Sequence, residues 1–164
     1  MSEFWQWIGN SLVLGIGATL VCDIWGQFVR LVTGIAPLDW RLVGRWIGHM
    51  PRAFTHDNIG KAQPVRAETA LGWSAHYLTG IALAAAMLGI YGNDWVAAPR
   101  LSEALAFGLA TVLLPFFVMQ PALGAGIAAA RTPRPMRARL LSVLTHGAFG
   151  VGLWCSAVLA NFFQ

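Results

Sequence analysis

Polar and ionisable side chains stand inside long apolar runs of this sequence. Asp23 and His146 each lie seven residues from an arginine that borders such a run, and His76 with Tyr77 lies near the start of another. An ionisable group at the centre of a membrane-spanning helix costs about 2.5–3.5 kcal/mol, so it usually has a partner or a function. The sequence therefore predicts a polar layer formed by Asp23, His76, Tyr77 and His146.

This polar layer has three interpretations. In the first, Asp23 and a histidine form a structural hydrogen bond or ion pair. In the second, the four side chains bind a small ligand, an ion or a proton, because histidine titrates near physiological pH and burial raises the pKa of a carboxyl group. In the third, His76 and His146 are the two axial ligands of a haem. The sequence assigns no catalytic residue and no cofactor, and it leaves open whether the protein is an enzyme.

Four apolar runs must position these side chains, and each is about as long as a membrane-spanning helix, which needs about 20 residues. We expect the spans at residues 8–31, 71–91, 101–120 and 140–163. Of the 164 residues, 57% are hydrophobic and 11% are charged, against roughly 25% charged in soluble domains. This composition excludes a soluble enzyme, a disordered tail and a disulfide scaffold. It predicts an all-α membrane protein whose residues 1–164 form a single integral membrane domain.

Small residues recur every fourth position along three of the spans, which lets helices approach closely. The stripes are Ser11, Gly15, Thr19 and Asp23; His76, Gly80 and Ala84; and Ala148, Gly152, Ser156 and Ala160. They predict faces for packing within the bundle. A partner chain could use one of them instead, so a homo-oligomer or a larger membrane complex is a possible assembly.

The basic residues predict the orientation of the spans. Ten of the eleven lie beside or between spans one and two, or between spans three and four, and only Arg100 lies elsewhere. Basic loops stay in the cytoplasm, so both of these connections are expected there and both termini outside. We expect a multi-pass protein of the bacterial inner membrane with the lipid bilayer, and no nucleic acid, as its partner.

The first connection contains an amphipathic segment at residues 38–50, which we expect to lie as a helix at the cytoplasmic interface. Arg41 and Arg45 share one of its faces and are candidates for contact with anionic headgroups. Alternatively, the helix is a lid on the bundle. His56, Asp57 and Glu68 follow it, but their spacing fits no metal signature, so no metal site is predicted.

The third run stays apolar beyond one span and contains Pro115 and Pro121. Proline removes a backbone donor and kinks a helix, so we expect an interruption here. Residues 121–130 would then form either a second interfacial piece or a re-entrant turn.

Four stretches of this sequence carry a resemblance to a known family. They are DWRLVGRWIGHM (39–50), ETALGWSAHYLTGIALA (68–84), LPFFVMQPALGAGIAAARTP (114–133) and THGAFGVGLW (145–154). Together they resemble the DUF2938 family, which implies a small multi-span bacterial membrane protein of unknown function. The resemblance supplies no functional residue. An accessory subunit of a larger membrane complex and a bis-histidine haem protein are therefore kept as alternatives to a protein with a ligand, ion or proton site.

Overall fold

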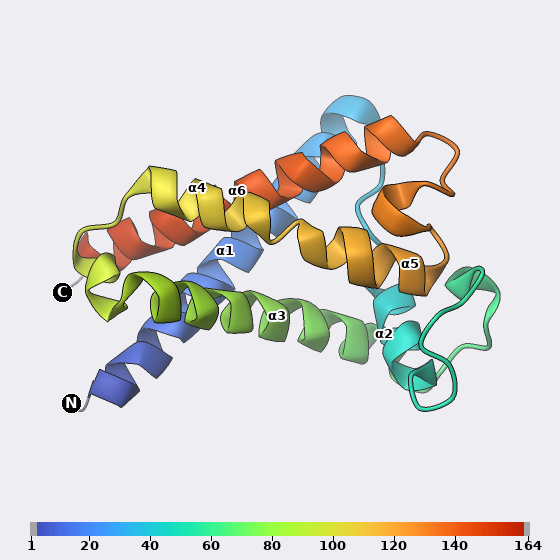
Figure 1. The fold of residues 1–164 in the computed structure, drawn as a ribbon, viewed down its shortest axis with the longest axis horizontal. Helices are drawn as coiled ribbons and strands as arrows, with labels where there is room; N and C mark the ends of the chain where they lie inside the picture. The colour runs from blue at the N-terminus through green and yellow to red at the C-terminus, as the bar shows by residue number, and fades with distance from the viewer. Residues whose placement is uncertain (1–2, 163–164) are drawn as a thin grey trace. The chain divides into compact units, whose positions relative to one another are not determined.

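The structure, a computed structural model, describes residues 3–162, and its regular elements there are all helical (Figure 1). In chain order the α-helices are α1 (Glu3–Thr33), α2 (Trp40–His49), α3 (Glu68–Tyr91), α4 (Leu101–Ala110), α5 (Gln120–Leu123) and α6 (Pro135–Phe162). No strand occurs in the described residues, which confirms the all-α prediction.

Four helical segments are long and apolar enough to cross a membrane, which agrees with the four predicted spans. They are Glu3–Thr33, Glu68–Tyr91, Leu101–Leu123 and Pro135–Phe162. Several helices extend beyond the predicted ranges because the predictions followed only the apolar centre of each run. Pro135, for example, begins α6 before the predicted start at 140, since the first turn of a helix does not need its missing N–H. The predicted end of the fourth span, Phe163, lies outside the described residues.

The third segment is interrupted at its first proline, as the sequence predicts. α4 ends at Ala110, a turn follows, and residues Pro115–Met119 form a π-helical turn. Pro115 has no N–H to donate to the carbonyl of Thr111, which instead accepts a hydrogen bond from Leu114 N–H at 3.0 Å. The helix type therefore changes at Pro115 without leaving the carbonyl of Thr111 unpaired.

The chain reverses direction after α5. Gly124 follows Leu123 with a φ of 97°, a left-handed conformation that glycine adopts without strain. Arg139 of α6 stabilises this reversal, because its Nε donates a hydrogen bond to the carbonyl of Ala128 at 2.8 Å. Whether residues 121–130 lie at a membrane interface or re-enter the bilayer stays a prediction.

The residues cluster into two compact units, and each unit draws on separate stretches of the chain. Unit 1 contains the residues up to Pro37, Tyr77–Ala110 and the residues from Thr145 on. Unit 2 contains Leu38–His76 and Thr111–Leu144. The single membrane domain expected from the sequence is untested.

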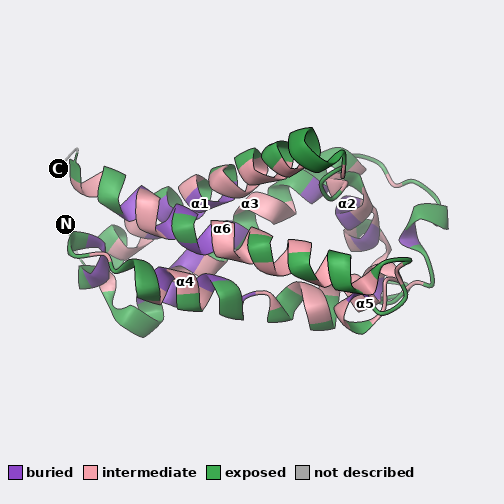
Figure 2. Ribbon diagram, turned by 90° about the horizontal axis from the view of Figure 1, so that it is seen from above, coloured by how far each residue is buried: buried purple, intermediate pink, exposed green. Residues whose placement is uncertain are grey.

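In unit 1, glycines let the helix backbones come close together. A Cβ atom added to Gly15 in α1 would lie 2.7 Å from the backbone nitrogen of Ile81 in α3. One added to Gly152 in α6 would lie 2.7 Å from Cα of Ala18. The small-residue faces predicted around these two glycines are thus confirmed as packing faces. Figure 2 shows buried residues on α4 and α6; the core of the unit comprises Leu14, Ala18, Ala84, Met87, Leu88, Trp95, Val96, Ala104, Phe149, Leu153 and Ala157.

In unit 2, the amphipathic helix predicted at residues 38–50 is present as α2. Its apolar side chains are covered by protein: Val43 is 5% exposed and Trp46 is 8% exposed. These two residues form a second core with Ile59 and Ala122. The apolar face of α2 is therefore used for packing inside unit 2, and its location at a membrane interface stays a prediction.

Candidate functional site

Asp23 and Tyr77, two of the predicted site residues, are in direct contact in unit 1. Tyr77 Oη donates a hydrogen bond to Oδ2 of Asp23 at 2.9 Å, which links α3 to α1. Both residues are half-buried. The contact depends on the close approach of the two helices one turn away, where Thr19 Oγ1 occupies the space that a Cβ on Gly80 would need. The small-residue faces of α1 and α3 therefore position this polar pair.

His146 lies in the same unit, on α6. Its imidazole is hydrogen-bonded to the backbone of Gly108 in α4. On the preceding residue, the carbonyl of Thr145 accepts a hydrogen bond from Sγ of Cys22 in α1 at 3.6 Å. Because Asp23 follows Cys22 and His146 follows Thr145, the two site residues lie at the same level of α1 and α6.

His76 belongs to unit 2 and lies beside two tryptophans. Its ring stacks on Trp40 of α2, with centroids 3.8 Å apart and planes at 20°. Trp73 contacts the same imidazole edge-on, with ring centroids 5.8 Å apart and ring planes at 63°. Two predictions remain untested: that His76 shares a site with Asp23, and that His76 and His146 ligate a haem.

Arg45 attaches α2 to the beginning of α3. Its Nε and Nη2 donate to the two carboxylate oxygens of Glu68 at 2.9 and 3.0 Å, and the side chains are only 12% and 16% exposed. Its Nη1 donates to the carbonyls of Gly60 and Ala62 at 3.1 and 3.2 Å. The hydrogen bond with Glu68 raises the pKa of the guanidinium. Most of the five donors of Arg45 are therefore used within the protein, and its predicted contact with lipid headgroups is untested.

Arg41, the other arginine with a predicted headgroup contact, lies at the surface of unit 2. It forms a 2.7 Å ion pair with Asp39, and the two side chains are 60% and 40% exposed. Asp39 also caps α2, since its Oδ1 accepts the backbone N–H of Arg41 at 3.0 Å. The hydrogen bond from the Arg41 side chain lowers the pKa of the Asp39 carboxyl. This exposed pair contrasts with the covered pair formed by Arg45.

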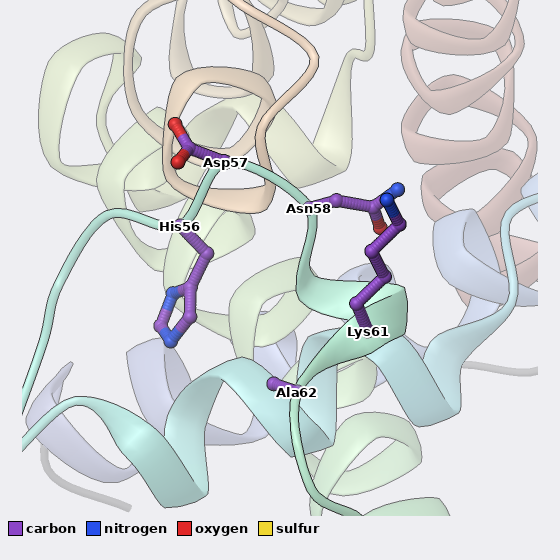
Figure 3. Close-up of a pocket in the computed structure, with 5 residues that line it drawn as sticks. All are labelled: His56, Asp57, Asn58, Lys61 and Ala62. Carbon is purple, nitrogen blue, oxygen red and sulfur yellow. The ribbon is translucent and has the colours of Figure 1, made fainter.

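A pocket of about 620 Å³ lies in the connection between α2 and α3 (Figure 3). Figure 3 shows the imidazole of His56 and the side chain of Lys61 on opposite sides of it, with the carboxylate of Asp57 turned away. Nδ1 of His56 is buried and has no hydrogen-bond partner. Among residues 3–162, no group of three or more His, Cys, Asp or Glu side chains could hold a metal ion. The lining is His56, Asp57, Asn58, Lys61 and Ala62.

Two neighbours of the predicted residues were missed by the sequence reasoning. The sequence groups Glu68 with His56 and Asp57, whereas in the structure it is the ion-pair partner of Arg45. Trp40 belongs to the amphipathic segment predicted at residues 38–50, and in the structure it stacks on His76. Both contacts join positions far apart in the chain, and no local spacing indicates them.

The family model described as a protein of unknown function (DUF2938) matches residues 12–160, which is most of the chain. No curated protein and no solved structure matches the sequence. The residues matched include Asp23, His76, Tyr77 and His146.

Proposed function

We propose that this chain, which belongs to the DUF2938 family of proteins of unknown function, is a four-span protein of the bacterial inner membrane. Four helical segments of suitable length and composition support this proposal. The distribution of basic residues supports an orientation with both arginine-bearing connections in the cytoplasm and both termini outside.

Within this protein, we propose that Asp23, Tyr77 and His146 form a site that takes up a proton, a small ion or a small polar ligand. The observation that carries this proposal is the hydrogen bond between Tyr77 and Asp23, because it places a carboxylate and its donor between two apolar helices. Asp23 lies seven residues before Arg30, which borders the apolar run, and so about 10 Å along α1 from that border. Its carboxylate is therefore well inside the proposed span.

The energies favour a functional interpretation of this pair. A carboxylate at the centre of a span costs about 2.5–3.5 kcal/mol, whereas a hydrogen bond between membrane helices contributes about 0.6 and at most about 1.7 kcal/mol. A single hydrogen bond such as that between Tyr77 and Asp23 is therefore worth less than an ionised group costs at the centre of a span. Ionisable residues retained at this cost are typical of ion and proton sites.

The test uses the full chain in detergent and measures its thermal unfolding midpoint between pH 5 and pH 8, with and without added Na⁺ or K⁺. The wild-type midpoint is expected to depend on pH or on one of the cations. Asp23→Asn keeps the shape of the side chain and is expected to remove that dependence, and Tyr77→Phe is expected to shift it. Tyr91→Phe makes the same change at an exposed position of α3 and is expected to leave it unaltered.

An Asp23→Asn variant with the same pH and cation dependence as the wild type would contradict the proposed site. The membrane proposal is tested separately, by reporter fusions in the two arginine-bearing connections. If the two reporters lie on opposite sides of the membrane, the four-span arrangement is wrong.

A further inference from the structure

The two units differ sharply in charge. Unit 2 holds nine basic and three acidic residues, a net charge of +6, whereas unit 1 holds two basic and four acidic residues, a net charge of −2. Two of the three acids in unit 2, Asp39 and Glu68, are already in ion pairs. The basic excess of the chain is therefore concentrated in unit 2.

Three of these basic residues, Arg131, Arg134 and Arg137, lie around the start of α6 and are exposed. None of them forms an ion pair with another residue in the part of the chain that the structure describes. The sequence holds no acidic residue after Glu103. The positive end of a helix dipole disfavours cations, so these arginines do not stabilise α6. Their placement indicates an anionic partner outside the protein.

Large apolar side chains accompany these arginines. Ile127 is 59% exposed, Met136 is 71% exposed and Leu140 is 59% exposed. Met136 and Leu140 are four residues apart on α6 and so lie on the same face. Nucleic acid would contact the arginines but offers little to exposed aliphatic chains. An anionic bilayer accepts both, with phosphates for the guanidinium groups and the boundary of the acyl chains for the apolar groups.

We propose that this surface, formed by Arg131, Arg134, Arg137, Ile127, Met136 and Leu140, binds the anionic phospholipids of the cytoplasmic leaflet. The guanidinium groups bind lipid phosphate oxygens, and Met136 and Leu140 enter the headgroup region beside them. The proposal goes beyond the polar site of unit 1, because it uses none of that site's residues. It shares with the proposed function only the premise that α6 enters a membrane.

The experiment uses the full chain in a neutral detergent and titrates it with phosphatidylglycerol or, separately, with phosphatidylcholine. Lipid binding is followed by native mass spectrometry and by the thermal unfolding midpoint. We expect preferential binding of phosphatidylglycerol that weakens as the salt concentration rises from about 0.05 to 0.5 M. Salt screens the attraction between charges, because the Debye length falls from about 10 Å at 0.1 M to about 3 Å at 1 M. Each arginine is worth about a fivefold change in affinity, so Arg134→Gln with Arg137→Gln should weaken binding roughly 25-fold.

The matched control is the double variant Arg52→Gln with Arg66→Gln, which removes the same charge from exposed positions in the connection between α2 and α3. We expect it to bind phosphatidylglycerol more tightly than the Arg134→Gln with Arg137→Gln variant does. Equal losses in the two double variants would overturn the proposal, because the effect would then be that of net charge alone. Wild-type binding that does not depend on salt would also overturn it. So would stabilisation by inorganic phosphate or by an RNA oligonucleotide that matches the effect of phosphatidylglycerol.

Discussion

Replacing Gly15 with alanine is expected to destabilise the protein, whereas the same replacement at Gly9 is expected to be neutral or stabilising. Both glycines lie inside α1, so replacing either one with alanine raises the helix propensity of its position. A Cβ on Gly9 has no atom within 4 Å. A Cβ on Gly15 would lie 2.7 Å from the nitrogen of Ile81 and 2.9 Å from the carbonyl carbon of Gly80. These neighbours are backbone atoms and cannot rotate away.

The magnitude follows from two opposing terms. Alanine stabilises the interior of a helix by up to about 1 kcal/mol relative to glycine. We expect Gly9→Ala to show this gain in stability and no opposing loss. Overpacking costs about 1–3 kcal/mol, and backbone neighbours place Gly15→Ala at the upper end of that range. The net expectation is a loss of about 2 kcal/mol for Gly15→Ala, and a difference of about 3 kcal/mol between the two variants.

The assay is reversible unfolding of the full chain in mixed micelles, titrated with sodium dodecyl sulfate and followed by tryptophan fluorescence and circular dichroism. Tyr77→Phe is then added to each background, because its bond to Asp23 depends on the approach of α1 and α3. It should cost about 0.6–1.7 kcal/mol in the wild type and in Gly9→Ala, and clearly less in Gly15→Ala. If Gly15→Ala is as stable as Gly9→Ala, the close contact between α1 and α3 is refuted.

The remaining predictions concern the two arginine pairs of unit 2. Because Arg41 lowers the pKa of Asp39, the charged carboxyl contributes stability that is complete above its ordinary value of 3.8 and is lost as the pH falls below it. Asp39→Asn keeps a side chain that can cap α2 and should remove this acid-dependent loss in a thermal unfolding series between pH 2 and pH 6. Arg45→Gln should lower the unfolding midpoint at pH 7 more than Arg41→Gln, because the pair with Glu68 is covered and the pair with Asp39 is exposed. Equal midpoints for these two arginine variants would contradict the reasoning.

The number of long helices could be predicted from the sequence because hydropathy and length are local properties. The interruption near Pro115 could be predicted for the same reason, since proline acts on the backbone hydrogen bond of its own turn. The packing role of Gly15 followed from the recurrence of small residues every fourth position. The replacement of α-helix by a π-helical turn at Pro115–Met119 did not follow, because it depends on how the neighbouring turns satisfy their carbonyls.

The site was less predictable than the helices. The sequence predicts Asp23 and Tyr77 in one polar layer, and the structure joins them by a hydrogen bond. The burial of Val43 and Trp46 could not be predicted, since an amphipathic pattern shows that a helix has an apolar face but not what covers it. The pairing of Arg45 with Glu68 depends on the folded connection between them, which has no regular pattern.

Close approach of helix backbones through glycine occurs in both units, and polar contacts accompany it in unit 2. Hydrocarbon does not drive apolar helices together, so helices within a bilayer associate through close backbone packing, as Gly15 and Gly152 do in unit 1. In unit 2, a Cβ on Gly72 would collide with the carbonyl of Trp40, so α2 and α3 also pack closely. The ion pair of Arg45 and the hydrogen bond from Trp46 Nε1 to the carbonyl of Phe54 at 2.8 Å add polar contacts there. Charged groups such as Arg45 are accommodated most cheaply where their remaining surface meets water or headgroups. We therefore expect the covered pair of Arg45 and Glu68 to lie outside the hydrocarbon, where water or headgroups reach its remaining surface.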